Sequence, residues 1–204
     1  MEQVLSLRTR HLTVVLEDIY QPHNASAVLR SCECFGVQDV HVVENRNTYK
    51  VNPDVDQGAS KWLDLIRYND ADQDNTRACL ARLRSRGYRL VAATPHSDDQ
   101  LLDEIEVEQP LALLLGTEEV GLSPNAMAEA DAFVKVPMFG FTESFNISVC
   151  AALMLRELTA KIRRSDLDWR LTAAEKLDLR LQWYRRSLRR SQLLEERFVA
   201  GQID

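Results

Sequence analysis

The chain has 204 residues, enough for one substantial hydrophobic core or for a domain with an appendage. Hydrophobic residues make up 45% and charged residues 27%, and no apolar run approaches the roughly 20 residues that a membrane span needs. The net charge of −6 argues against a general polyanion binder. Residues 1–150 carry 13 basic and 23 acidic side chains, whereas residues 151–204 carry 12 and 8. The basic tail is therefore either a nucleic-acid contact or a solvated charged helix.

Cysteine and histidine spacing indicates neither a metal site nor a disulfide framework. The four cysteines include no Cys-x-x-Cys pair, and the four histidines have no nucleophile partner pattern and no metalloprotease spacing. The first ten residues lack a secretory apolar segment. We therefore expect reduced thiols in a cytoplasmic protein that uses no metal and is not bound to a membrane.

In chain order, short apolar segments alternate with segments of helical periodicity. A helix that ends at Gly36 follows the first strand, and Ser123-Pro124 has the pattern of a helix start. Strands are predicted at 12–16, 40–43, 63–68, 90–93, 111–115 and 132–136. Helices are predicted at 24–35, 76–85, from 123, 147–162 and 172–199, and a long surface loop at 45–60.

This alternation predicts an α/β fold with a mostly parallel sheet and helices on both faces. Leu111–Leu115 is the most apolar strand and is predicted to be central. In the last helix, Leu177, Leu181, Tyr184 and Leu188 form one apolar stripe, so we expect this helix to dock on the body or on another subunit.

Two loops that follow predicted strands resemble ligand-binding loops. Residues 116–121 and 137–146 are rich in Gly, Pro and small polar residues, and such loops expose main-chain groups at the strand ends where open α/β sheets bind ligands. The first has neither the Walker A ending nor the three-glycine dinucleotide spacing, which disfavours a kinase, a GTPase or an ordinary dehydrogenase. The second is too apolar for a free surface loop, so it should pack against protein or a flat ligand. For Ser144 and Asn146, helix capping is as well supported as ligand contact.

Three motifs together are similar to those of the SpoU/TrmH family of RNA 2′-O-methyltransferases in the SPOUT superfamily. They are Asn24-x-x-Ala-x-x-Arg30, Leu115-Gly116-x-Glu118-x-x-Gly121, and Val136-Pro-Met138-x-Gly140-x-x-x-Ser144-Phe145-Asn146. The tail further resembles the branch that methylates guanosine-18 of tRNA. Its matching segments are Trp183-Tyr-Arg185-Arg186-Ser and Arg189-Arg190-Ser.

The resemblance implies a C-terminal trefoil knot, a methyltransferase domain over 1–165, a helical extension over 166–204, and a homodimer. It implies S-adenosylmethionine as cofactor and tRNA as substrate. The implied cofactor residues are Thr94, Leu115, Gly116, Glu118, Gly121, Val136, Met138, Gly140, Ser144, Phe145 and Asn146. The implied catalytic residues are Asn24, Arg30, Glu118, Ser144 and Asn146, and the expected RNA contacts are Arg30, Arg185, Arg186, Arg189 and Arg190.

Arg30 is assigned to the ribose hydroxyl by this resemblance. Because a guanidinium is effectively always protonated, we expect Arg30 to grip a phosphate and stabilise the developing alkoxide rather than accept a proton. Asn24 would orient Arg30. The alternatives are the same chemistry on ribosomal RNA, a non-catalytic RNA-binding protein on this scaffold, or, more distantly, a nucleotide-dependent oxidoreductase.

Overall fold

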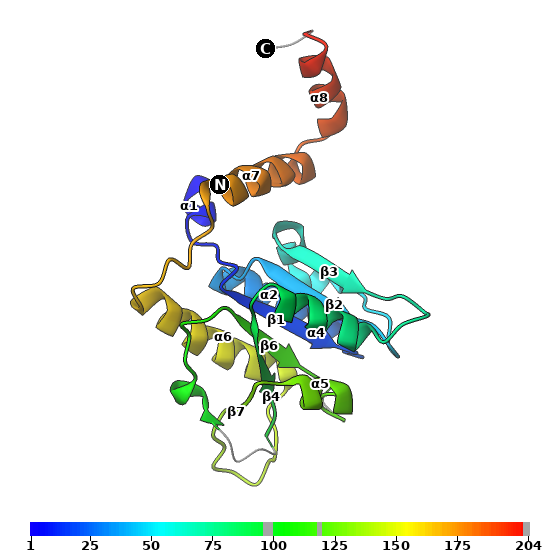
Figure 1. Ribbon diagram of the computed structural model, residues 1–204. Coiled ribbons are helices and arrows are strands. Elements are labelled where there is room, and N and C mark those ends of the chain that lie inside the picture. The colour runs from blue at the N-terminus through cyan, green and yellow to red at the C-terminus, as the bar shows by residue number, and fades with distance from the viewer. Residues whose placement is uncertain (96–99, 118–119, 202–204) are drawn as a thin grey trace. The chain divides into compact units, whose positions relative to one another are not determined.

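The computed structural model describes residues 1–95, 100–117 and 120–201. The chain divides into two compact units, one of residues 9–169 and one of residues 1–8 and 170–204. Within the described part of the larger unit, seven strands form a single parallel sheet with the order β3-β2-β1-β6-β4-β7-β5 (Figure 1). The predicted α/β class and the parallel sheet are confirmed.

The elements follow the predicted alternation closely. The strands are β1 (Leu12–Glu17), β2 (Asp39–Val43), β3 (Asp64–Tyr68), β4 (Arg89–Ala93), β5 (Gln100–Leu101), β6 (Leu111–Leu115) and β7 (Ala132–Lys135). The helices of this unit are α2 (Pro22–Phe35), α3 (Pro53–Asp56), α4 (Asn75–Ser85), α5 (Pro124–Glu129) and α6 (Ile147–Arg164), with 3₁₀ turns η1 (Ala59–Trp62) and η2 (Leu102–Glu104).

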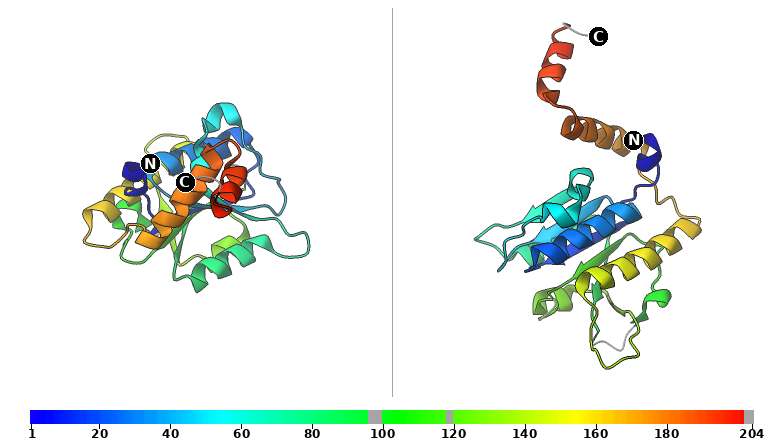
Figure 2. Two further views of the ribbon diagram at one scale, coloured as in Figure 1. Left: turned by 90° about the horizontal axis from the view of Figure 1, so that it is seen from above. Right: turned by 180° about the vertical axis from the view of Figure 1, so that it is seen from behind.

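Side-chain alternation along the central strands builds two apolar cores. Leu12, Val14 and Leu16 of β1 belong to a core with residues of α2 and α6, and Val15 belongs to another core with residues of α4 and α5. Figures 1 and 2 show these two pairs of helices on opposite faces of the sheet. All five residues of β6 are buried. Because β1 and β4 flank β6 on either side, the prediction that Leu111–Leu115 is central is confirmed.

Parallel pairing puts the carboxyl ends of the strands at one edge of the sheet. The segments that follow β1, β4, β6 and β7 therefore emerge close together, although they lie far apart in the sequence. This is the edge at which open α/β sheets bind ligands.

The predicted loop at 45–60 is wrong in part, because it contains α3 and the start of η1. Asn52 caps α3 by accepting a hydrogen bond from the Asp54 N–H, and Pro53 occupies the first helical position, where its missing N–H costs nothing.

The predicted single helix over 172–199 is also wrong. It is divided into α7 (Ala173–Ser187) and α8 (Ser191–Val199), because Leu188 is extended and Arg190 adopts a left-handed conformation with φ of 61°. In the smaller unit, α7 contacts the N-terminal helix α1 (Glu2–Leu5). The buried residues of α7 are Leu179 and Trp183, and the Arg8 guanidinium lies 5.3 Å from the Trp183 ring.

The expected stripe at Leu177, Leu181, Tyr184 and Leu188 is exposed in the single chain. The docking of this stripe on the body or on another subunit stays a prediction. No helix in the described residues is long and apolar enough to cross a lipid bilayer.

Candidate active site

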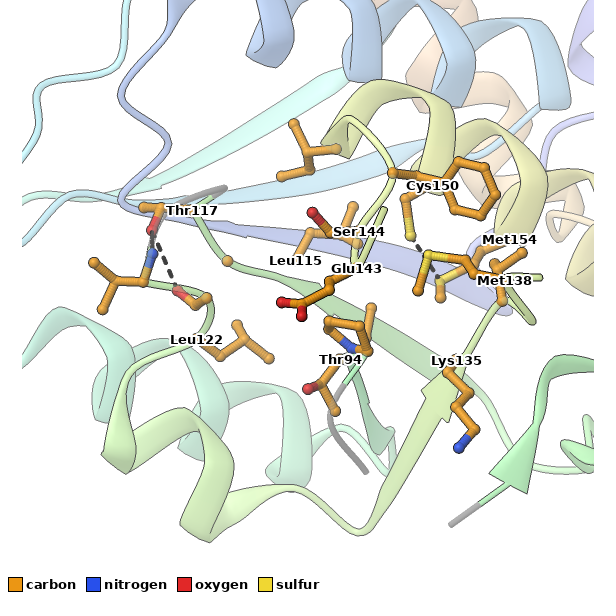
Figure 3. A pocket seen from close by; sticks show the side chains of 18 of the residues that line it. Thr94, Leu115, Thr117, Leu122, Lys135, Met138, Glu143, Ser144, Cys150 and Met154 are labelled. Carbon is orange, nitrogen blue, oxygen red and sulfur yellow. Dashed lines mark hydrogen bonds between the residues drawn. The ribbon is translucent and has the colours of Figure 1, made fainter. Parts of the chain in front are cut away.

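A cavity of about 450 Å³ opens at the carboxyl ends of β4, β6 and β7. Three segments converge on it: the residues after β4, the loop after β6, and the loop between β7 and α6 (Figure 3). Of the expected cofactor residues, those that line the cavity are Thr94, Leu115, Gly116, Gly121, Val136, Met138, Ser144 and Phe145.

The loop after β6 closes on itself through paired main-chain hydrogen bonds. The Thr117 N–H donates to the Gly121 carbonyl at 3.0 Å, and the Gly121 N–H donates to the Thr117 carbonyl at 2.9 Å. Gly121 has φ of +74°, a conformation that favours glycine. A Cβ on Gly116 would lie 2.2 Å from the Gly121 carbonyl carbon and 2.3 Å from the Leu122 nitrogen. The loop can close this tightly only because residue 116 lacks a side chain.

Buried Glu17 anchors the far end of this loop to the sheet. Its carboxylate accepts hydrogen bonds from the Ser123 N–H at 2.8 Å, from the Ser123 hydroxyl at 2.7 Å, and from the Thr76 hydroxyl. Ser123 also caps α5 by accepting from the Ala126 N–H, as its sequence pattern predicts. The carboxylate at the end of β1 therefore positions the loop that walls the cavity.

Motifs that are 122 residues apart in the sequence meet through two asparagines. The Asn146 side-chain amide donates to Asn24 Oδ1 at 3.1 Å, and Asn24 donates in turn to Gln21 Oε1 at 3.1 Å. Asn146 Oδ1 accepts from the Ser148 N–H and thereby caps α6. Asn146 thus has the capping role that its position suggested, and it also joins α2 to α6. Asn24 is only 4% exposed.

Replacing Asn24 with alanine should lower the free energy of unfolding by about 0.5–1.5 kcal/mol, the usual net contribution of a hydrogen bond, because the exposed Asn146 amide can bond to water once its acceptor is gone. Urea denaturation followed by circular dichroism measures this change. Asn69→Ala, at an exposed position outside both the pair and the cavity, is the control. Equal stability of Asn24→Ala and the parent would contradict the structural role of the pair.

Several expected site residues do not line the cavity. Glu118 lies outside the described residues, and Gly140 and Asn146 are not among the lining residues. Arg30 lies on the exposed side of α2, six residues beyond Asn24, and does not line the cavity formed by the described part of one chain. Asn24, which the resemblance expects to orient Arg30, forms hydrogen bonds with Gln21 and Asn146.

Four of the five expected RNA-binding arginines, those of the tail, lie on the exposed surface of the smaller unit. Arg185 forms two hydrogen bonds with the Glu195 carboxylate, at 2.7 and 2.8 Å. Arg186 donates to Gln182 Oε1 at 3.3 Å, and Arg189 and Arg190 lie at the break between α7 and α8. The charge of Arg185 is thus partly balanced within the chain.

Sequence reasoning missed other residues of the cavity wall. Cys150 and Met154 lie one turn apart on α6, and Ile147 precedes them on the same helix, so their spacing of three and four was the available signal. Burial raises the pKa of the Cys150 thiol to about 11, so this thiol is protonated at neutral pH. Lys135, Met127 and Glu143 also line the cavity.

The polar groups around the cavity are hydroxyls, main-chain groups and single charges. Over residues 1–95, 100–117 and 120–201 there is no group of three His, Cys, Asp or Glu side chains that could hold a metal ion. Apolar side chains dominate the wall, with Leu115, Leu122 and Val136 beside Thr94 and Ser144. Such a wall suits a flat organic ligand with a few polar groups.

Comparison with known proteins agrees with these observations. The sequence profile of the SpoU rRNA Methylase family matches residues 11–156. The chain is 42% identical over 195 residues to a tRNA (guanosine(18)-2′-O)-methyltransferase of Borreliella burgdorferi, covering 96% of this chain and 87% of that protein. It is 35% identical to the enzyme of the same name from Thermus thermophilus, covering 77% of this chain and 78% of that protein.

The fold matches a solved structure over nearly its whole length. The crystal structure of the A. aeolicus TrmH/SpoU tRNA modifying enzyme superimposes with a TM-score of 0.80 and 26% identity, covering 92% of this chain and 94% of that one. The family profile matches most of the chain, the Borreliella protein is 42% identical to it, and Asn24 of the first motif contacts Asn146 of the third. These findings lead to one conclusion. The chain belongs to the SpoU rRNA methylase family.

Proposed function

We propose that this protein transfers a methyl group from S-adenosylmethionine to the ribose 2′-hydroxyl of guanosine-18 in tRNA. The relatives from Borreliella and Thermus carry this activity in their names. The observation that carries the proposal is the cavity at the ends of β4, β6 and β7, since residues of the second and third motifs line it together.

The cavity fits the donor by its chemistry. Leu115, Leu122 and Val136 offer an apolar wall for an adenine ring, and the loop after β6 presents main-chain groups beside it. When bound, S-adenosylmethionine supplies a methyl group on a positively charged sulfur. The carboxylate of Glu143 and the ammonium group of Lys135 both line this cavity, so its wall has one charge of each sign.

In this proposal the residues of the first and third motifs act on the substrate side. Arg30 binds the phosphate next to the target ribose and stabilises the charge that develops on its oxygen. Asn24 holds the start of α2 against Asn146, and Ser144 contributes a hydroxyl to the cavity wall. Glu118 is assigned to the cofactor site by its motif. The 2′-proton leaves to a phosphate oxygen or to water.

We further propose that the enzyme is a cytoplasmic homodimer. Phe139 and Phe141 are fully exposed in the single chain, and Val149 and Leu153 of α6 are 46% and 41% exposed. An apolar surface of this kind beside an active site supports coverage by a second copy. The trefoil knot, the methyltransferase domain at 1–165 and the extension at 166–204 belong to this proposal.

Mass-spectrometric mapping of ribose methylation tests the function. The purified protein is incubated with S-adenosylmethionine and with tRNA or ribosomal RNA transcribed without modifications. We expect one methyl group on guanosine-18 of tRNA. If only ribosomal RNA is methylated, the substrate is ribosomal RNA and not tRNA. If calorimetry detects binding of S-adenosylmethionine but neither RNA is methylated, the protein is a non-catalytic RNA-binding protein.

The arginines of the tail should add to RNA affinity by neutralising phosphates. Replacing Arg185, Arg186, Arg189 and Arg190 by alanine should weaken tRNA binding and reduce the slope of log K against log salt by about 0.9 for each phosphate that is no longer neutralised. Filter binding at several salt concentrations measures this slope. Because Arg185 is paired with Glu195, Arg185→Ala alone should change the slope least. An unchanged slope in the fourfold variant would show that the RNA-binding surface does not include these arginines.

A further inference from the structure

A second cavity, of about 490 Å³, adjoins the first at the same edge of the sheet. It lies at the carboxyl end of β1, and the segment that begins α2 contributes Tyr20 and Gln21 to its wall. Three residues of the loop after β6, namely Thr117, Val120 and Gly121, line both cavities. A ligand in the second cavity is therefore separated from a ligand in the first by a single loop.

Asp18 offers a hydrogen-bond acceptor in this cavity. Its Oδ1 atom accepts from the main-chain N–H groups of Asn45 and Arg46, at 2.7 and 2.8 Å, while Oδ2 accepts no hydrogen bond from any residue that the structure describes. The neighbouring carboxylate of Glu17 is already occupied by Ser123 and Thr76. Asp18 also has φ of +53°, which costs conformational energy in a residue other than glycine.

Tyr20 and Arg46 complete the polar and aromatic wall. The Tyr20 side chain is 72% exposed even though it lines the cavity, so much of its ring is open to a ligand. The Arg46 backbone is held by Asp18, and its guanidinium makes no hydrogen bond or ion pair with the described residues. An aromatic face, a cationic fork and a carboxylate acceptor thus surround one space.

These groups match the edges of a guanine base. Guanine has adjacent N1–H and N2–H₂ donors that a carboxylate oxygen accepts, and its O6 and N7 atoms accept from arginine. Adenine and cytosine present an acceptor where guanine presents N1–H, so a carboxylate would repel them. RNA-binding proteins stack unpaired, splayed-out bases on their aromatic side chains. A phosphate is a poorer occupant, because Glu17 and Asp18 place two carboxylates in the wall.

We propose that this second cavity binds the guanine base of the nucleotide whose ribose is methylated, with Asp18 reading the N1–H and N2–H₂ edge, Tyr20 stacking on the ring and Arg46 facing O6 and N7. This inference rests on the proposed function and adds the basis for choosing guanosine. Because a ribose is bonded directly to its base, the base subsite must lie beside the site of the methyl donor. The second cavity meets this requirement, because it shares one loop with the first.

Asp18→Asn is the sharpest test. The asparagine keeps an oxygen for the N–H groups of Asn45 and Arg46, but it turns the second oxygen into a donor that opposes guanine N1–H. Methylation is measured as kcat/KM on tRNA transcripts with guanosine, inosine or adenosine at the target position. Inosine lacks only the N2 amino group. The matched control is Asp72→Asn, an exposed aspartate outside both cavities.

We expect the parent protein to prefer guanosine over inosine by about 10-fold or more, because inosine lacks the N2 donor and so loses one hydrogen bond to a charged group. The kcat/KM of Asp18→Asn on the guanosine transcript should be about 10-fold or more below that of the parent. Its kcat/KM values on guanosine and inosine should be equal, and its ratio of kcat/KM on adenosine to kcat/KM on guanosine should rise. Its affinity for S-adenosylmethionine should be unchanged. An unaltered guanosine-to-inosine ratio in Asp18→Asn would overturn the proposal.

Tyr20 provides a second route to the same answer if Asp18→Asn does not fold. Tyr20→Ala should lower kcat/KM on every base by a similar factor, of about 5- to 150-fold for removal of one aromatic stacking partner, and Tyr20→Phe should restore it. Full activity of Tyr20→Ala would overturn the proposed stacking. The parent protein is assayed before any variant. If it binds S-adenosylmethionine but methylates no tRNA, the proposed function itself is wrong, and this outcome is distinct from a failure of the guanine-binding proposal.

Discussion

Gly116→Ala is expected to weaken the binding of S-adenosylmethionine by about 100-fold. The new Cβ would lie 2.2–2.3 Å from main-chain atoms of Gly121 and Leu122, and backbone atoms cannot rotate away as a flexible side chain does. We expect a cost of about 3 kcal/mol, the upper end for an overpacked site. If the whole cost falls on the bound state, affinity drops by about 100-fold. Isothermal titration calorimetry measures it.

Gly140→Ala is the matched control for this prediction. Gly140 belongs to the third motif, but its Cβ would meet nothing within 4 Å in the single chain, and its conformation does not require glycine. The affinity of Gly140→Ala for S-adenosylmethionine should stay within about 3-fold of that of the parent. Substitutions at exposed positions usually change the free energy of unfolding by no more than about 0.5 kcal/mol. If the two alanine variants bind equally well, the closed loop at Thr117–Gly121 is not the donor site.

Arg30→Ala should lower the rate of methylation by about 1,000-fold, the upper end for the loss of one group that stabilises a developing oxyanion. Binding of S-adenosylmethionine should survive, because Arg30 does not line the cavity of its own chain as described. Single-turnover rates and calorimetry separate the two effects. Arg30→Lys keeps the charge but not the planar fork, so it should recover only part of the rate.

Equal loss of methylation and of donor binding in Arg30→Ala would assign Arg30 to the cofactor rather than to the substrate. Arg82→Ala, on the exposed side of α4 at the opposite face of the sheet, is the control for removal of one surface charge. It should leave both measurements close to those of the parent.

The sheet could be predicted from the sequence because its strands are short apolar runs. Leu12–Leu16 and Leu111–Leu115 are buried on both faces, so they appear as continuous hydrophobic segments, and Gly36 marks the end of α2 with a left-handed cap. The break between α7 and α8 could not be predicted in this way. No glycine or proline marks it, and Arg190 adopts the left-handed conformation instead.

The candidate site could be predicted only as separate motifs. Helical spacing and Ser-Pro pairs report local structure, but the contact of Asn24 with Asn146 depends on the packing of α2 against α6. Cys150 and Met154 look like ordinary core residues of an amphipathic helix, and only the position of α6 over the ends of β6 and β7 brings them to the cavity. The second cavity has no sequence signature, because its wall combines three separate segments.

The common wall of the two cavities has a thermodynamic consequence. A molecule that fixes Thr117, Val120 and Gly121 in one position changes the free energy with which the neighbouring space accepts its own occupant. Linkage makes this effect reciprocal, so any factor by which the methyl donor raises the affinity for tRNA must equal the factor by which tRNA raises the affinity for the donor. Cooperativity between the two substrates would then arise within one short turn, with no need for a hinge between domains.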